Sequence, residues 1–336
     1  MKRSTSLPAA GARIATSVTV GLAAVVLFAC ADDSSTTAPS PAASAVSAGR
    51  IPVAQENRIV YQSNRDPLGS FDIYSMLPDG SGNTRLTSSF DNFYPALSPD
   101  GTRVVFTSNR DNPMYDIYVM NSDGSYVKRL AASAAANYNP RWSADGTKII
   151  FTSTRGAADP TDRGLSASWE VYLMNSDGSN LKRVTNNTVG EWDPDLSPDG
   201  TQIVFASDRD HPRFSWNRDL YLMNVDGTNV RRLTSQDGTI EAPRFDASGQ
   251  RVVYDVMNGS APGIYVLAGH SPTRLTFDAG GSIEFTPTWS PDGTQIAYTH
   301  FVSGTGSQIY KMNADGSNQK RVTRDPAYAQ RPDWGR

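Results

Sequence analysis

The sequence LSPDGTRVVFTSNRD occupies residues 97–111, and LSPDGTQIVFASDRD repeats it closely at residues 196–210. Two further copies, WSADGTKIIFTSTRG and WSPDGTQIAYTHF, begin at Trp142 and Trp289. A diverged copy, FDASGQRVVYDVM, begins at Phe245, and NRIVYQSNRD at Asn57 is a copy that lacks its beginning. The chain is therefore built from one repeated unit, and the repeat has to be explained before any single residue.

A second phrase follows each copy after a gap of variable length. Its members are DIYSMLPDGSGNTRLTS, DIYVMNSDGSYVKRLAA, EVYLMNSDGSNLKRVTN, DLYLMNVDGTNVRRLTS, GIYVLAGHSPTRLTF and QIYKMNADGSNQKRVTR. Together the two phrases define six units of roughly forty to fifty residues, a period typical of propellers and solenoids.

Each unit reads as four short strands, here called A, B, C and D. Segments such as VVFTS and DIYVM are rich in β-branched and aromatic residues and are bounded by turn residues. An Asp-Gly pair lies between A and B and another between C and D, and this dipeptide favours a tight hairpin. Six four-stranded antiparallel sheets predict an all-β, six-bladed β-propeller.

The two ends of the repeat region predict how the ring closes. The first unit has no strand A, whereas the chain ends on RPDWGR at residues 331–336, which resembles a strand A with nothing after it. We expect residues 332–334 to complete the first blade, because joining the ends in one sheet removes an exposed strand edge.

The sixth unit, with the phrases WSPDGTQIAY and QIYKMNADGSNQKRVT, resembles the TolB-type β-propeller repeat, which also occurs in the propellers of prolyl-oligopeptidase-like enzymes. The resemblance spans residues 57–336 and implies the fold. TolB proteins carry a separate α/β domain before the propeller, for which no counterpart is recognised in this sequence, so the resemblance leaves open a role in the Tol–Pal system. Neither the GxSxG motif nor an α/β-hydrolase domain is recognised, so the peptidase activity is not implied.

The first fifty residues predict an exported lipoprotein. Lys2 and Arg3 precede an apolar run that is clearest over residues 18–29, as in a signal peptide. The run ends in LFAC, which resembles the lipobox in which Cys30 is lipidated, and Cys30 is the only cysteine. The alternative is a cytosolic or simply cleaved protein with a chance cysteine. We therefore expect a signal peptide at 1–29, a disordered Ser/Ala/Pro tether at 30–50 and the propeller at 51–336.

Charge limits the partners of such a protein. The whole chain has a formal net charge of −3, and loss of a leader with three basic residues leaves 28 basic against 34 acidic residues. This balance argues against nucleic acid, which favours a clustered basic face. We expect a monomer in the bacterial cell envelope, anchored by its lipid on the periplasmic side or at the cell surface.

Four units carry an arginine at the end of strand B and an acid at the start of strand C, and the other two units lack both. Because B and C are antiparallel neighbours, we expect structural ion pairs rather than a ring of ligands for an acidic substrate. The expected pairs are Arg65 with Asp72, Arg110 with Asp116, Arg155 with Glu170, and Arg209 with Asp219.

The B–C and D–A loops differ most between units, and the strand order places them on one face of the ring. A rigid scaffold with variable loops on one face is typical of binding surfaces. The position two residues before the repeated proline of strand A is aromatic in four of six units, and acids lie beside it. The candidate binding residues are Phe93, Tyr138, Glu191, Trp192, Asp193, Glu241, Glu284 and Phe285. The aromatic members either grip a ligand or cap the seams between blades.

Two functions follow from these features. The first is a non-catalytic scaffold that binds an envelope protein or a peptidoglycan or other glycan component. The second is a lyase or lactonase acting on sugars, with a carboxylate or metal site at the channel mouth. We prefer the first, because His211, His270 and His300 fall in unlike positions and no catalytic set is recognisable. No cofactor is predicted, although Ca²⁺ on the mouth carboxylates is left open.

Overall fold

A computed structural model describes residues 57–65, 69–157, 169–211, 216–277, 281–324 and 327–335. The predicted signal peptide, Cys30 and the tether lie outside these ranges. The chain consists of two compact units that meet after Ile51, and every described residue belongs to the second unit. Among the described residues, no helix is long and apolar enough to cross a membrane.

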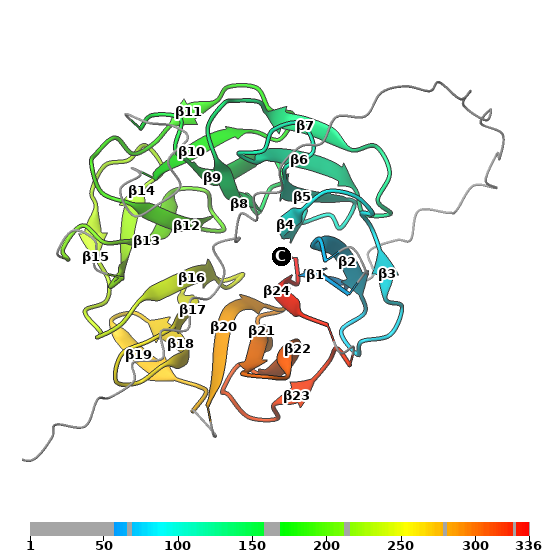
Figure 1. Ribbon diagram of the computed structural model, residues 1–336. Helices are drawn as coiled ribbons and strands as arrows, with labels where there is room; N and C mark the ends of the chain where they lie inside the picture. The colour runs from blue at the N-terminus through cyan, green and yellow to red at the C-terminus, as the bar shows by residue number, and fades with distance from the viewer. Residues whose placement is uncertain are drawn as a thin grey trace, which may run out of the picture. The chain divides into compact units, whose positions relative to one another are not determined.

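The described chain forms 24 strands in six antiparallel sheets of four, as the repeats predict (Figure 1). In the order A to D, blade 1 contains β24 (Ala329–Asp333), β1 (Ile59–Ser63), β2 (Asp72–Met76) and β3 (Thr84–Arg85); blade 2 contains β4 (Asn92–Leu97), β5 (Arg103–Ser108), β6 (Asp116–Asn121) and β7 (Lys128–Ala131); and blade 3 contains β8 (Asn137–Trp142), β9 (Lys148–Ser153), β10 (Glu170–Asn175) and β11 (Lys182–Arg183). Blade 4 contains β12 (Glu191–Leu196), β13 (Gln202–Ser207), β14 (Asp219–Asn224) and β15 (Arg231–Arg232); blade 5 contains β16 (Ile240–Phe245), β17 (Arg251–Val256), β18 (Gly263–Ala268) and β19 (Ser271–Arg274); and blade 6 contains β20 (Ser282–Trp289), β21 (Gln295–Val302), β22 (Gly306–Asn313) and β23 (Lys320–Arg321).

The C-terminal strand closes the ring, which confirms the prediction made from the chain ends. Strand β24 pairs antiparallel with β1, with Val60 opposite Asp333 and Gln62 opposite Gln330. Blade 1 thus combines the beginning and the end of the repeat region in one sheet (Figure 1).

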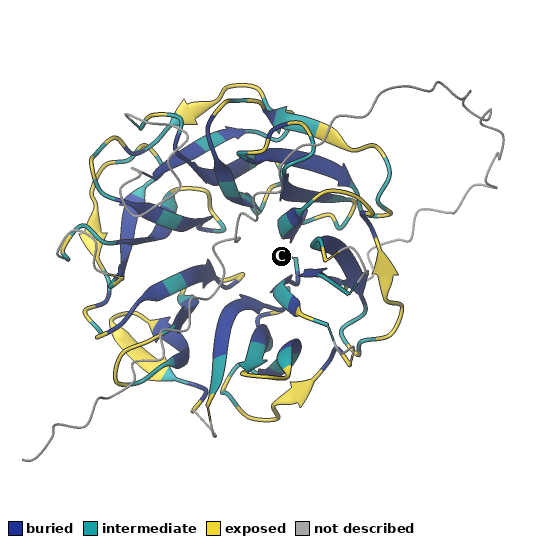
Figure 2. Ribbon diagram, in the orientation of Figure 1, coloured by how far each residue is buried: buried dark blue, intermediate teal, exposed yellow. Residues whose placement is uncertain are grey.

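The core lies in the seams between neighbouring sheets. One seam joins blades 1 and 2 through buried residues such as Val60, Ile73 and Phe106. Figure 2 shows that the inner strands are buried and the outermost D strands are largely exposed. Trp142 and Trp289 are each 4% exposed and donate their indole N–H, at 3.1 Å, to a carbonyl oxygen in strand A of the preceding blade. These two tryptophans therefore fill seams between neighbouring blades.

The Asp-Gly turns have the conformation that the sequence predicts. Gly101 in an A–B turn and Gly124 in a C–D turn have φ angles of 68° and 88°, which glycine adopts without steric cost. The preceding aspartate accepts hydrogen bonds across the turn; for example, Asp123 accepts from the amide and hydroxyl of Ser125. The NSDGS segments are therefore hairpin turns.

The four acids that start strand C pair with a different arginine from the one expected. The ion pairs join Asp72 to Arg85, Asp116 to Arg129, Glu170 to Arg183 and Asp219 to Arg232. Each of these arginines lies in strand D, opposite the tyrosine of strand C. In blade 2, for example, Arg129 lies opposite Tyr118. The prediction that each acid pairs with the arginine of strand B was wrong, because the arginine of strand D lies on the same side of the sheet as the acid.

The arginines at the end of strand B instead stack on aromatic rings of their own blade. The guanidinium of Arg110 lies 5.0 Å from the ring centroid of Tyr118, and that of Arg65 lies 4.1 Å from the ring centroid of Tyr74. Arg155 donates a 2.7 Å hydrogen bond to Asn137, and Arg209 pairs with Glu191. Arg110, Arg155 and Arg209 therefore bind the first residue of strand A of their own blade rather than the start of strand C.

The acids also join neighbouring blades. The side-chain amide of Asn137, at the start of blade 3, donates a 2.9 Å hydrogen bond to Asp116 of blade 2. Asn92 of blade 2 contacts Asp72 of blade 1 in the same way, at 3.3 Å. The buried acid therefore connects strand C of one blade to strand A of the next.

Candidate functional site

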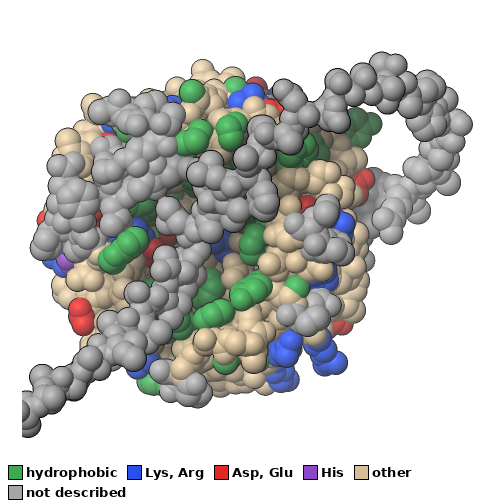
Figure 3. All heavy atoms as spheres, in the orientation of Figure 1, with side chains coloured by type: hydrophobic (Ala, Val, Ile, Leu, Met, Phe, Trp, Pro, Cys, Tyr) green, Lys and Arg blue, Asp and Glu red, His purple; other side chains and the backbone are tan. Residues whose placement is uncertain are grey.

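The antiparallel strand order gives the ring two different faces. The B–C and D–A loops lie on one, here called the loop face, and the A–B and C–D turns lie on the other, here called the turn face. On the face shown in Figure 3, hydrophobic side chains gather around the centre of the ring.

A continuous series of aromatic side chains surrounds part of the channel mouth on the loop face. Phe93 contacts Phe71 and Tyr115 with ring centroids 5.3 and 5.7 Å apart, and Tyr138 contacts Tyr115 and Trp169 at 5.4 and 5.5 Å. This aromatic arc comprises Phe71, Phe93, Tyr94, Tyr115, Tyr138 and Trp169, from blades 1 to 3. Phe93 and Tyr138 are half-buried, so the arc presents ring surface while its members support one another.

Trp192 extends the arc toward blades 4 and 5. It packs beside Tyr138 on the buried Trp169, and the guanidinium of Arg218 lies 3.8 Å from its ring centroid. Arg218 in turn pairs with Glu241. The ring of Trp192 lies against Gly190, where an added Cβ would come within 1.9 Å of the indole. A glycine is therefore required beside this tryptophan for its ring to occupy this position.

The other candidate binding residues are buried and bonded within the protein. Glu191 is fully buried and pairs with Arg209, and Glu284 bonds to His300 at 2.9 Å. Phe285 is 4% exposed, and Asp193 is 5% exposed and accepts a hydrogen bond from the amide of Ala242. The exposed part of the predicted site therefore consists of Phe93, Tyr138, Trp192 and Glu241, which are half-buried.

Below the arc, every strand A contains a bulge immediately before its proline. The residue at this bulge is left-handed in all six blades, and the residues and φ angles are Tyr94 (52°), Asn139 (53°), Asp193 (50°), Ala242 (48°), Thr286 (49°) and Arg331 (53°). Six non-glycine residues in this sparsely populated region indicate a constraint that the whole ring imposes. Bulges re-aim side chains, and here they do so around the channel.

Charged groups cluster at the level of the bulges. Burial raises the pKa of Asp255 well above its usual range, and neighbouring Glu241 raises it further. Burial alone would lower the pKa of Arg331, but Tyr94, Asp193 and Glu241 raise it. Arg331 also lies 4.2 Å from the ring centroid of Tyr94, so its guanidinium packs against an aromatic ring at this level.

The three histidines lie apart from one another. His211 bonds to Asp219 in blade 4, His300 bonds to Glu284 in blade 6, and His270 lies in a turn of blade 5. In the parts of the chain that the structure describes, no three His, Cys, Asp or Glu side chains form a metal-binding group. Calcium at the channel mouth stays a prediction from the sequence.

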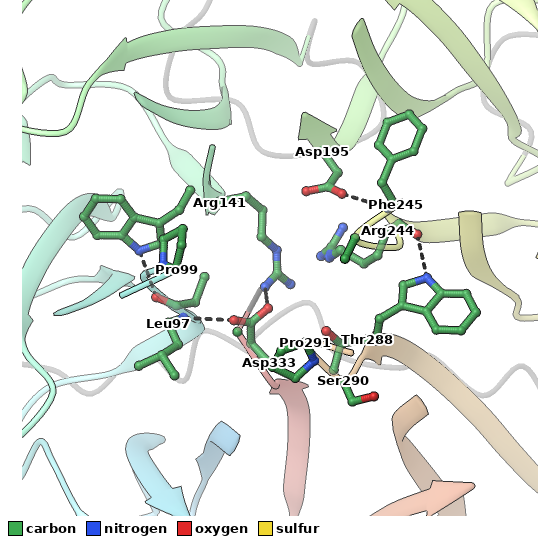
Figure 4. A pocket seen from close by; sticks show the side chains of 15 residues that line it. Leu97, Pro99, Arg141, Asp195, Arg244, Phe245, Thr288, Ser290, Pro291 and Asp333 are labelled. Carbon is green, nitrogen blue, oxygen red and sulfur yellow. Dashed lines mark hydrogen bonds and ion pairs between the residues drawn. The ribbon is translucent and has the colours of Figure 1, made fainter. Parts of the chain in front are cut away.

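A second concavity, on the turn face, was not predicted. The residue immediately after each strand A proline lies around it; these residues are Ala96, Arg141, Asp195, Arg244, Thr288 and Asp333. Figure 4 shows the Arg141 and Arg244 side chains directed toward the space between them. The sequence places two arginines and two aspartates at this one repeat position. The pattern does not reveal that these side chains meet unless the six positions are arranged as a ring.

The fold and its channel define the class as a six-bladed β-propeller, and comparison identifies the family. The family model for PD40, the TolB beta propeller domain, matches residues 82–160 and 215–336, more than half of the chain. The chain therefore belongs to the TolB β-propeller domain family.

Curated relatives share part of their length with this chain. It is 31% identical over 240 residues to the uncharacterized protein Atu1656 of Agrobacterium fabrum, covering 71% of this chain and 65% of that protein. It is also 31% identical over 162 residues to the TolB homolog of Chlorobium luteolum, covering 48% of this chain and 34% of that protein. The chain thus spans less than two thirds of either relative.

Solved structures share the fold at low sequence identity. TolB from Acinetobacter baumannii superimposes with a TM-score of 0.67 at 20% identity, covering 83% of this chain and 66% of that one. An oligogalacturonate lyase in complex with manganese has a TM-score of 0.55 at 16% identity, covering 80% of this chain and 74% of that one. The same fold therefore serves proteins of different function.

Proposed function

We propose that this protein is a lipid-anchored component of the bacterial cell envelope whose propeller is a non-catalytic binding scaffold. Its partner is an envelope protein or a peptidoglycan or other glycan component, bound on the loop face. Membership of the TolB propeller family supports a scaffold, and the leader sequence with Cys30 supports the anchor.

The aromatic arc is the observation that carries the binding proposal. Interior packing needs rings that are fully covered, but Phe93, Tyr94 and Tyr138 keep part of their surface exposed at the channel mouth. Aromatic rings supply a large contact area with few rotatable bonds, so they lose little conformational entropy when a partner binds. Rings also stack on sugar and peptide surfaces, which fits both classes of partner.

The enzymatic alternative has weaker support in the side chains. Three of the four acids that a metal site at the mouth would use are paired within the protein: Glu191 with Arg209, Glu241 with Arg218, and Glu284 with His300. A carboxylate already bonded to a side chain of the protein is a poor ligand for a metal ion. The likeness to a manganese-bound lyase concerns the fold alone.

The anchor is tested by replacing Cys30 with alanine in the native host. We expect the wild-type chain to incorporate labelled palmitate and to sediment with membranes, and Cys30→Ala to lose both properties. Palmitate labelling or membrane sedimentation that is unchanged in Cys30→Ala would contradict the lipid anchor without affecting the binding proposal.

The binding face is tested by crosslinking in the intact envelope. A photoreactive residue replaces Trp192 on the loop face, and the control replaces Ser122 in a C–D turn on the turn face. We expect one discrete adduct, with a protein or a glycan, from position 192 alone. Equal labelling from both positions would mean that the loop face is not the binding surface.

A further inference from the structure

The concavity on the turn face lies at the centre of the ring, where the A–B turns meet. Its cavity volume is about 30 Å³, and it is partly open to solvent. Polar groups at its base come from blades 1, 3, 4 and 5, and the surrounding wall is mostly apolar, with Leu97, Pro99, Phe245, Trp289 and Pro291 (Figure 4).

Arg244 is a buried cation with unused hydrogen-bond donors. It is 6% exposed, and its Nη1 donates a 2.6 Å hydrogen bond to the carbonyl oxygen of Pro243, its own neighbour. Its Nε has no hydrogen-bond partner among the described residues. A guanidinium has five N–H donors, and a buried donor that makes no hydrogen bond destabilises the protein. The side chain is thus arranged for an acceptor that the neighbouring blades do not supply.

The nearby carboxylates are committed to other groups. Asp333 forms an ion pair with Arg141 and accepts the amide of Leu97 at 2.9 Å, and Asp195 accepts the amide of Phe245 at 2.9 Å. Burial and, to a smaller extent, the neighbouring Arg141 lower the pKa of Arg244 to about 9, because Asp195, Asp193 and Asp333 oppose the effect only in part. The charge of Arg244 is therefore not fully compensated by the protein.

We infer that this concavity binds a carboxylate, held by the guanidinium of Arg244 with Arg141 on the opposite side. Both guanidinium groups are directed into the space between them, and arginine pairs with carboxylates through planar, charge-assisted hydrogen bonds (Figure 4). The apolar wall favours a carboxylate carried by an apolar group. Either a small organic acid or the C-terminal carboxylate of a peptide with an apolar last residue has this chemistry.

The test is titration calorimetry and thermal unfolding of the full-length chain in detergent at pH 7. The probes are sodium propionate, the peptide acetyl-Ala-Ala-Phe with a free carboxylate, and the same peptide as its C-terminal amide, all compared with sodium chloride at equal ionic strength. We expect saturable binding and a higher melting temperature with at least one free carboxylate and with neither the amide nor chloride. Binding of propionate would show that a small organic acid is a sufficient ligand. Binding of the free-carboxylate peptide but not propionate would identify the ligand as the C-terminal carboxylate of a peptide.

Two variants locate the site. Arg244→Gln removes the cation, and Thr288→Asp places a competing carboxylate at the adjacent ring position, so each should weaken binding about tenfold or more. Lys148→Gln, which alters a cation at the start of β9 on the same face that bonds to Asn175 and does not line the concavity, should bind like the wild type. If Arg244→Gln fails to fold, Thr288→Asp still provides the test. Equal binding of acid and amide peptides, no response to any carboxylate, or unchanged affinity in Thr288→Asp would overturn the inference.

Discussion

Removing the carboxylate of Asp333 should loosen the closure of the ring. Asp333 lies in β24, the last strand, and its two oxygens bind groups of other blades: the guanidinium of Arg141 in blade 3 and the amide of Leu97 in blade 2. The side chains of Arg141 and Asp333 are each 11% exposed, so the pair is largely shielded from solvent. The substitution Asp333→Ala therefore affects three blades at the point where the chain ends meet.

The size of the effect follows from the groups left without a partner. Breaking a buried ion pair by removing one member costs roughly 3–5 kcal/mol, and an unsatisfied buried amide costs about 1–3 kcal/mol. The two losses share one side chain and are not additive, so we expect a decrease of about 4 kcal/mol in the free energy of unfolding. A domain of this size shifts its melting temperature by roughly 2–4 °C per kcal/mol, which predicts a decrease on the order of 10 °C.

The assay is urea unfolding followed by tryptophan fluorescence, together with calorimetry of the same samples. Asp237→Ala, an exposed loop aspartate, is the matched control and should change stability by less than about 0.5 kcal/mol. Asp333→Asn keeps an acceptor for Leu97 but loses the charge, so its stability should fall between those of wild type and Asp333→Ala. A loss below about 1 kcal/mol for Asp333→Ala would refute the assignment of Asp333 as a closing residue.

Three further predictions concern other parts of the ring. Gly190→Ala should displace the Trp192 ring, shift its fluorescence and destabilise the protein by about 1–3 kcal/mol, whereas Gly101→Ala at a solvent-exposed turn with no atom within 4 Å of an added Cβ should leave that fluorescence unchanged. Asp255→Asn should raise the free energy of unfolding at pH 7, measured by urea unfolding, because burial disfavours the charged carboxylate. A decrease in the free energy of unfolding would show that the charge is needed. The hydroxyls of Ser143 and Ser179 lower the pKa of the turn residues Asp145 and Asp177, so the stabilisation they provide is present above about pH 4 and is lost as the pH falls below it; stability that rises on acidification through this range would contradict the turn geometry.

The fold was predictable from the sequence because the Asp-Gly turns recur at the same positions in successive units. Each Asp-Gly turn marks a hairpin, so strand order and register follow from the spacing alone. Even the closure through residues 332–334 could be inferred, because the first unit lacks the strand that the last residues supply. Repeats make such predictions strong, since an error in one unit would be visible against five others.

Side-chain partners were harder to predict, and the strand B arginines show why. Alternation along strands places Arg110, Asp116 and Arg129 on one side of blade 2, so two cations compete for a single acid. Arg110 stacks on the ring of Tyr118, and Arg129 pairs with Asp116. A sequence pattern specifies the side of a sheet but not which of two nearby groups makes the contact.

The exposure of the candidate binding residues could be predicted only in part, for a similar reason. The aromatic residues before each proline do lie at the channel mouth, yet Phe285 is covered while Phe93 and Tyr138 keep exposed surface. Burial at the mouth depends on the neighbouring loops, whose conformation the repeat does not encode. The ring of residues after the proline was overlooked because its members differ in charge from blade to blade, and their significance arises only from convergence on the channel axis.

The most direct test of the binding scaffold is co-purification of envelope components with full-length variants of the aromatic arc. Tyr138→Ala removes a half-buried ring on the loop face, and the matched control Tyr126→Ala removes a tyrosine that is 85% exposed beside a C–D turn on the turn face. Both variants are first shown to unfold cooperatively, so that a loss reflects binding. We predict that Tyr138→Ala reduces the recovered partner about tenfold or more while Tyr126→Ala recovers as much as wild type. Equal recovery with Tyr138→Ala and wild type, or a loss confined to Tyr126→Ala, would contradict the proposal that the loop face binds the partner.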